Sequence, residues 1–269
     1  MRKEAAIKKN AAKKSAASPG RIASAAWEKI FRDLKERLGR AAEKKFFPSE
    51  PPANGSLPKE AAGPSAQERL PSVSQVAADH PGESFRILVS TMISLRTKDE
   101  VTYAAAQRLL ARAPAPAALA ALPEKEIAKL IYPAGFYRIK AANIRETARR
   151  ITEDYGGKVP ADRDLLMAFP GVGRKTANLV VSLGFGIDAI CVDTHVHRIS
   201  NRTGWVETKT PEETETDLCA RVPRKFWIPI NELLVKYGQT VCTPASPHCG
   251  SCPLAAERCK KRGVSRQRD

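Results

Sequence analysis

The sequence predicts an all-α protein. Apolar residues recur at helical spacing in successive segments from residue 73 onward. No segment shows the sustained alternation of β-branched and polar residues that an extensive sheet requires. A glycine-bearing turn over residues 170–175 also lies between two stretches that each carry an apolar helical stripe. Together these observations favour helices joined by short turns.

The first 72 residues differ from the rest of the chain. Residues 1–20 are mainly Ala, Lys and Ser with almost no large apolar side chain, so we expect them to be disordered. A basic amphipathic helix is expected within residues 22–47, where apolar residues recur at helical spacing. Residues 48–71 hold several prolines and glycines, which is typical of a linker. The segment is interpreted as a basic extension, either a tether to DNA or a solvated tail.

The following part of the chain contains the first helices of the core. Helices are expected over residues 85–95 and 101–111, because each segment is apolar at helical spacing. The Ala/Pro-rich segment 113–123 is expected to be a loop. Two further helices are expected over residues 127–131 and 139–155, and a pair of glycines ends the second.

The turn Pro170-Gly171-Val172-Gly173-Arg174-Lys175 is the most informative local feature. Its two glycines permit positive φ angles and a close approach to another backbone. Amide N–H groups at the start of the following helix favour an anion, and phosphate is the natural one. The alternative is a simple helix–helix connection with a C-cap glycine.

Four cysteines lie within 18 residues near the C-terminus: Cys242, Cys249, Cys252 and Cys259, separated by six, two and six residues. The chain shows no secretory signal and no apolar run long enough to span a membrane, so a reduced compartment is expected. Bacterial cytoplasm, nucleus and organelle remain open. We therefore favour a metal over disulfides. The spacing alone does not separate zinc from an iron–sulfur cluster, since both accept four thiolates.

The bulk composition indicates a polyanionic partner. The formal net charge is +16, and the pI is near 9.8. Such a charge favours nucleic acid through counterion release, although a histone-like or ribosomal protein would share it. The 6% aromatic content does not suggest the stacking platforms of single-strand binders. Nucleotide-driven chemistry is not expected, because the sequence has neither a Rossmann fingerprint nor a phosphate-loop motif.

The hairpin, the aspartate that follows it and the cysteine cluster together resemble the endonuclease III family of DNA glycosylases. The resemblance covers roughly residues 73 to 262 and follows the family's order. It is carried by Ser94-Leu95-Arg96-Thr97-Lys98-Asp99, Gly135-Phe136-Tyr137 with Lys140-Ala141, the hairpin, Val192-Asp193-Thr194-His195, Asn201-Arg202-Thr203, Tyr237-Gly238 and the four cysteines.

The resemblance implies a two-lobed helical fold around a DNA-binding cleft, with a 4Fe–4S cluster held by Cys242, Cys249, Cys252 and Cys259. Residues 77–187 would form a six-helix lobe with the helix-hairpin-helix near 163–182. Residues 73–76 and 188–262 would form the iron–sulfur lobe, and residues 263–269 a basic tail.

Two residues depart from the family pattern. The last cysteine gap is six residues, where five is usual, and a loop absorbs the extra residue. Arg96 stands where the family commonly has a glutamine that fills the gap left by an everted nucleotide. Arginine can also enter a base stack, or Arg96 can be a phosphate contact on the helix surface. The preferred lesion and opposing base are therefore left open.

The resemblance also implies the catalytic pair. Lys175 would attack the sugar C1′ of a damaged nucleotide, and Asp193 would handle the lysine proton and stabilise positive charge on the sugar. The non-catalytic alternatives are a phosphate contact for Lys175 and a helix N-cap for Asp193. The N-cap role is compatible with catalysis.

The predicted function is a bifunctional DNA glycosylase and abasic-site lyase that acts as a monomer on oxidised pyrimidines in duplex DNA. Arg96, Arg174 and the amides of Gly171, Val172 and Gly173 are the predicted DNA contacts. The alternatives are an adenine or mismatch glycosylase of the same superfamily, against which Lys175 argues, and a non-catalytic damage-sensing binder.

Overall fold

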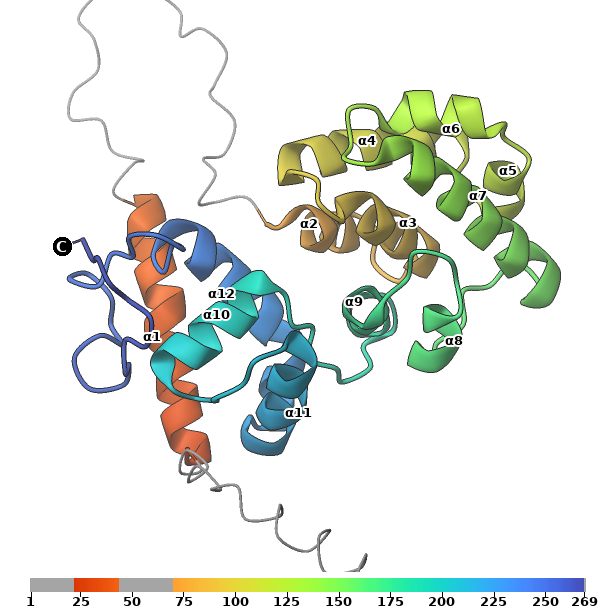
Figure 1. Ribbon diagram of the computed structural model, residues 1–269. Helices are drawn as coiled ribbons and strands as arrows, with labels where there is room; N and C mark the ends of the chain where they lie inside the picture. The colour runs from red at the N-terminus through yellow and green to blue at the C-terminus, as the bar shows by residue number, and fades with distance from the viewer. Residues whose placement is uncertain (1–21, 44–69, 269) are drawn as a thin grey trace, which may run out of the picture.

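A computed structural model of the chain describes residues 22–43 and 70–268. It confirms the all-α prediction: helices joined by turns make up both halves of the molecule (Figure 1). Within the described residues, the only β pairing is an isolated bridge between His248 and Arg268. No helix in this part of the chain is long and apolar enough to cross a membrane.

The first lobe is built around α3, Ser84–Ser94, whose side chains are buried on nearly every side. A helix that is apolar all round has to be surrounded by other helices. Three of its side chains are completely buried: Ile87, Leu88 and Ile93. Helix α9 packs along this helix. The other helices of the lobe are α2 Ser72–Asp79, α4 Asp99–Arg112, α5 Pro116–Ala120, α6 Glu124–Ile131, α7 Tyr137–Asp154, α8 Arg163–Met167 and α9 Arg174–Phe185.

The Ala/Pro segment expected to be a loop contains a short helix, α5, and that expectation was wrong. Pro116 occupies the first turn, where its missing N–H leaves no helical bond unmade. The alanines that follow have the highest helix propensity. Leu119 then buries its side chain completely, and α5 packs against α7, so tertiary contact stabilises a helix too short to form alone.

The second lobe contains α1 Ser24–Glu43, α10 Thr194–Thr203, α11 Pro211–Arg221, the 3₁₀ turn η1 Arg224–Phe226 and α12 Trp227–Thr240. In Figure 1, α1 lies beside α10 and α12. Its apolar face is fully buried there: Trp27 and Leu34 are 0% exposed, and the Trp27 and Trp205 rings meet edge to face at 4.9 Å. The sequence analysis grouped this helix with the extension, whereas the structure makes it part of the second core. The remaining predictions for residues 1–20 and 48–71 lie outside the described residues.

A second boundary also differs from the expectation. Residues 73–76 were assigned to the iron–sulfur lobe, but they belong to α2, which packs on α3 and α4. Val73 is buried in the first core for this reason. The chain therefore enters the first lobe at α2 and returns to the second lobe after α9.

The turn after α3 carries Arg96 in a left-handed conformation, with φ of 52°. Lys140, buried on α7, donates from Nζ to the carbonyl oxygens of Ile93 (2.6 Å) and Leu95 (2.5 Å) and to Thr97 Oγ1 (2.8 Å). Burial lowers the pKa of Lys140 to about 8, while the three acceptors favour its charged form. Lys140 thus fixes the turn that presents Arg96.

Replacing Lys140 with methionine keeps the length of the side chain but removes all three donors. We expect Lys140→Met to lower the free energy of unfolding by roughly 2–4 kcal/mol, because buried acceptors lose their partners. Denaturant unfolding measures this effect, with Lys129→Met on exposed α6 surface as the matched control. Equal stability of the two variants would show that these bonds do not hold the turn.

Candidate active site between the two lobes

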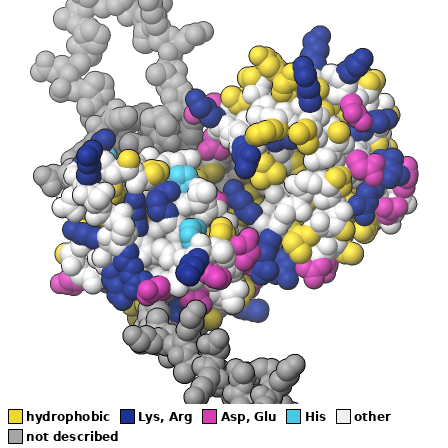
Figure 2. Space-filling view, viewed as in Figure 1, with side chains coloured by type: hydrophobic (Ala, Val, Ile, Leu, Met, Phe, Trp, Pro, Cys, Tyr) yellow, Lys and Arg dark blue, Asp and Glu magenta, His cyan; other side chains and the backbone are white. Residues whose placement is uncertain are grey.

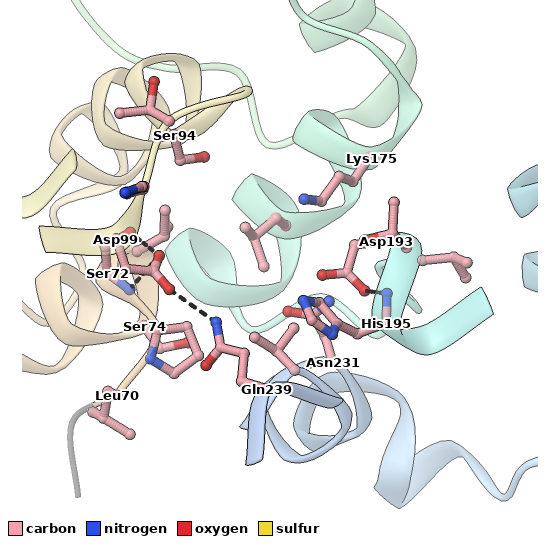
Figure 3. A pocket seen from close by; sticks show the side chains of 18 of the residues that line it. Leu70, Ser72, Ser74, Ser94, Asp99, Lys175, Asp193, His195, Asn231 and Gln239 are labelled. Atoms are coloured by element: carbon pink, nitrogen blue, oxygen red, sulfur yellow. Dashed lines mark hydrogen bonds between the residues drawn. The ribbon is translucent and has the colours of Figure 1, made fainter. Parts of the chain in front are cut away.

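A cavity of about 1350 Å³ lies between the lobes and is lined by residues from both. Its walls include Lys175 at the start of α9 and Asp193 just before α10. Figure 3 shows the Lys175 amine and the Asp193 carboxylate pointing into this cavity from adjacent walls, with Asp99 and Gln239 across from them. The volume accommodates a ring-sized substrate group. The structure thus brings together the two residues that the sequence analysis named as catalytic.

The hairpin between α8 and α9 depends on Gly171. This residue has φ of 76°, and a Cβ there would lie 2.6 Å from Asn143 Nδ2 on α7. Gly173 instead has φ of −92° and caps α9, with open space around its Cα. The sequence analysis expected both glycines to allow positive φ, but only Gly171 uses it.

The hairpin amides are not equivalent. Val172 buries its side chain in the first core, and its N–H donates to Phe169 O at 3.1 Å. Its predicted amide contact to phosphate therefore conflicts with a bond already made inside the turn. The amides of Gly171 and Gly173 have no acceptor among the described residues, and both residues are exposed. These two amides are the ones free to meet an anion.

Arg174, the first residue of α9, forms a two-pronged ion pair with Glu215 on α11. Arg174 Nε lies 2.8 Å and its second nitrogen 3.0 Å from the two Glu215 oxygens. Because Glu215 is 9% exposed at its side chain, this pair joins the two lobes at the cavity wall. The Arg174 charge that was predicted to meet phosphate is thus already shared with a carboxylate. The sequence analysis did not anticipate Glu215.

Asp193 caps α10, as the alternative interpretation expected. Its Oδ1 accepts from the N–H groups of His195 (2.8 Å) and Val196 (2.9 Å). The capping bonds use one oxygen only, and within the described part of the chain no donor bonds to the other. One carboxylate therefore both starts the helix and offers an oxygen to the cavity.

His195, two residues after Asp193, takes part in a network of hydrogen bonds centred on Arg198. Arg198 lies 3.0 Å from its Nδ1 and also donates to the carbonyl oxygens of Gly238 and Cys242. A Cβ at Gly238 would lie 2.3 Å from His195 Nδ1, so only glycine leaves room for the ring. Burial is the main cause that lowers the pKa of His195, which keeps the imidazole neutral at physiological pH.

Arg96 lines the cavity at its edge, and its guanidinium lies 5.5 Å from the Phe136 ring centroid. Phe136 is 57% exposed in a left-handed conformation, and Tyr132 and Ile139 are comparably exposed nearby in sequence. The sequence analysis noted Phe136 in a motif but not as a site residue. Large exposed apolar side chains beside a cavity indicate a contact surface.

The four cysteines of the C-terminal loop lie against the second core. Cys242, Cys252 and Cys259 pack on it, and several sulfurs already have hydrogen-bond donors near them. The Tyr237 hydroxyl lies 3.1 Å from Cys252 Sγ, and the Lys261 N–H lies 3.4 Å from Cys259 Sγ. Among residues 22–43 and 70–268, no three Cys, His, Asp or Glu side chains converge closely enough to hold one metal ion. A four-iron cluster requires a wider arrangement, because each thiolate binds a different iron.

The two cysteines outside the loop differ from each other. Cys191 is fully buried, donates to the Lys175 carbonyl at 3.5 Å, and has its pKa raised by burial to about 12. Cys219 on α11 is half-buried, and desolvation raises its pKa to about 11. The raised pKa keeps both as unreactive thiols at neutral pH.

Basic side chains occur on both lobes. Figure 2 shows Lys and Arg side chains on each lobe and along the boundary between them, mixed with acidic groups. The distribution is typical of a surface that meets a polyanion along its length.

Comparison with known proteins places these features in a family. Residues 89–224 match the HhH-GPD superfamily of base excision DNA repair proteins. Endonuclease III of Thermotoga maritima is 45% identical over 189 residues, which cover 70% of this chain and 89% of that protein. Endonuclease III homolog 2, chloroplastic, of Arabidopsis thaliana is 43% identical over 179 residues. The aligned region covers 63% of this chain and 46% of the plant protein.

Solved structures agree with the sequence comparison. The structure of a trapped endonuclease III–DNA covalent intermediate aligns with a TM-score of 0.63 and 35% identity, covering 71% of this chain and 93% of the other. The chain belongs to the endonuclease III family, within the HhH-GPD superfamily of base excision DNA repair proteins.

Proposed function

We propose that this protein is a bifunctional DNA glycosylase and abasic-site lyase that removes oxidised pyrimidines from duplex DNA. The observation that carries the proposal is one cavity that receives both the amine of Lys175 and a free carboxylate oxygen of Asp193. Family membership and a DNA-bound covalent intermediate of a 35% identical relative support it. A glycosylase without lyase activity does not need an amine at this position.

The reaction begins when the unprotonated Lys175 amine bonds to C1′ of the sugar. The glycosidic bond breaks, its electron pair leaves with the base, and the base takes up a proton. The Asp193 oxygen accepts the proton lost from the attacking nitrogen and stabilises positive charge on the sugar. Sugar ring opening gives a Schiff base between Lys175 and C1′. Removal of a C2′ proton then expels the 3′ phosphate oxygen, which cuts the strand by β-elimination.

The duplex is positioned by groups around the cavity. The free amides of Gly171 and Gly173 lie at the start of α9, where the helix dipole also favours phosphate. Arg96, with Phe136 beside it, occupies the gap left when the damaged nucleotide leaves the stack. Extrusion costs least where pairing is already damaged, which helps to select lesions. We propose that the protein acts as a monomer.

The cysteine loop is proposed to hold a 4Fe–4S cluster through Cys242, Cys249, Cys252 and Cys259. Four soft thiolates, with donors from Tyr237 and the Lys261 amide near their sulfurs, fit such a group. When bound, the cluster supplies a rigid cross-link for the C-terminal loop. That loop carries four basic residues, of which Arg258 and Arg262 pair with Asp33 and Glu207. Lys260 and Lys261 are the cations proposed to contact phosphate.

Replacing Lys175 with alanine tests the nucleophile. Wild-type protein incubated with an abasic-site duplex and borohydride should yield a covalent adduct, and Lys175→Ala should yield none, because no amine remains to form the Schiff base. Denaturing gel electrophoresis measures the adduct. Lys98→Ala removes another lysine that lines the same cavity and should retain it. A strong adduct from Lys175→Ala would remove Lys175 from this role.

Replacing Asp193 with asparagine separates its two roles. Asparagine caps helices as well as aspartate, so the free energy of unfolding should change by less than about 1 kcal/mol. Loss of the carboxylate should lower single-turnover base excision by about 10²–10⁴-fold. Asp193→Ala is the comparison, because it loses the cap as well and should also be less stable. Unchanged excision in Asp193→Asn would limit this residue to capping.

The cluster is tested by spectroscopy and metal analysis. Protein purified without oxygen should be brown, absorb near roughly 400 nm and contain about four irons per chain. Cys252→Ser should lower both the absorbance and the iron content, whereas Cys219→Ser, outside the loop, should keep them. A colourless, folded wild-type protein that contains zinc would contradict the assignment.

A further inference from the structure

The wall of the cavity opposite Lys175 carries a polar group that the catalytic account does not use. Gln239, on α12 of the second lobe, donates from Nε2 to Asp99 Oδ2 at 3.1 Å. Asp99, at the start of α4 in the first lobe, accepts at its other oxygen from Ser72 Oγ (2.8 Å) and Ser72 N (3.3 Å). Figure 3 shows this chain of bonds across the cavity from Lys175 and Asp193. All three side chains line the cavity.

These bonds fix the orientation of the Gln239 amide. A carboxylate accepts hydrogen bonds and donates none, so the amide nitrogen has to face Asp99. The carbonyl oxygen Oε1 then faces away from Asp99, and no donor among the described residues pairs with it. The second N–H of the same amide also has no acceptor within residues 22–43 and 70–268. Gln239 therefore has one acceptor and one donor left for a ligand in the cavity, and its bond to Asp99 sets which end of the amide faces that residue.

Asp99 is in turn held firmly. Ser72 is 4% exposed and donates through both its hydroxyl and its backbone amide to one Asp99 oxygen. A buried residue that supplies two donors restricts the carboxylate to one position. A positioned donor–acceptor pair at the wall of a cavity is the arrangement that proteins use to orient small polar ring systems.

We propose that Gln239, oriented by Asp99, is the specificity-determining residue that reads the polar edge of the extruded base. The inference rests on the proposed function and adds the chemical group that is recognised. Thymine glycol, an oxidised pyrimidine, and dihydrouracil, a ring-saturated one, both carry a ring N–H beside a carbonyl oxygen, which complements Oε1 and the remaining N–H of Gln239. Lys175 and Asp193 hold the sugar end, and Gln239 holds the far edge of the ring.

This role predicts a difference between two substrates of the same enzyme. A duplex with dihydrouracil presents a base to Gln239, whereas a duplex with a preformed abasic site presents none. Contacts to the base therefore contribute to base excision but not to strand cleavage at an abasic site. A residue that only stabilises the fold would affect both reactions.

The test compares Gln239→Leu with wild type in single-turnover kinetics on both duplexes. Leucine keeps the approximate volume and removes the donor and the acceptor. We expect the rate constant for dihydrouracil excision to fall at least about tenfold, the effect of roughly 1.4 kcal/mol of lost binding. Cleavage and borohydride trapping at the abasic site should stay within about twofold. Gln75→Leu, a second glutamine lining the cavity but bonded to Asp79 on its own helix, should leave both rates unchanged.

Asp99→Asn provides the second arm. Asparagine can still accept from Ser72, but it no longer requires the Gln239 nitrogen to face it, so dihydrouracil excision should fall while abasic-site cleavage persists. Equal loss of both reactions in Gln239→Leu, or no loss in either, would overturn the inference. Failure of the proposed function has a different signature, since wild-type protein would then form no adduct with the abasic duplex.

Discussion

The placement of α9 is the constraint on which the site depends. Its apolar side chains are buried against α3 in the first lobe, so the helix cannot rotate without exposing them. At its first turn, the Arg174–Glu215 pair joins it to α11 of the second lobe. The next residue is Lys175. Packing thus fixes the axis of the helix, and an ion pair between the lobes fixes the end that carries the amine.

Several polar groups in this protein serve both fold and chemistry. Asp193 uses one carboxylate oxygen to start α10 and presents the other to the cavity. Asp99 bonds Ser72 with one oxygen and orients Gln239 with the other. In both cases the structural bonds immobilise a carboxylate, which removes the entropic cost of ordering it when substrate arrives. In the proposed mechanism, these bonds hold the two carboxylates in place before DNA binds.

The cysteine loop is connected to both ends of the second lobe. Arg258 bonds Asp33 on α1 at 2.5 Å, and Arg202 on α10 donates to the carbonyl oxygens of Thr243 and Pro244. Helix α1 precedes the first lobe in sequence but packs with the last helices of the chain. The second core is therefore built from segments far apart in sequence, and two of its helices, α10 and α12, also contribute residues to the cavity wall.

The sequence alone determined the helical class, the hairpin, the pairing of Lys175 with Asp193 and the cysteine loop, because each is a local pattern or an ordered set of motifs. It did not reveal α5, whose short helix needs the burial of Leu119, or the packing of α1 into the second core. Nor did it show that Glu215 forms an ion pair with Arg174, that the Val172 N–H donates to Phe169 O within the turn, or that Gln239 donates to Asp99. Those contacts join residues distant in sequence, and only the folded chain decides which polar groups remain free.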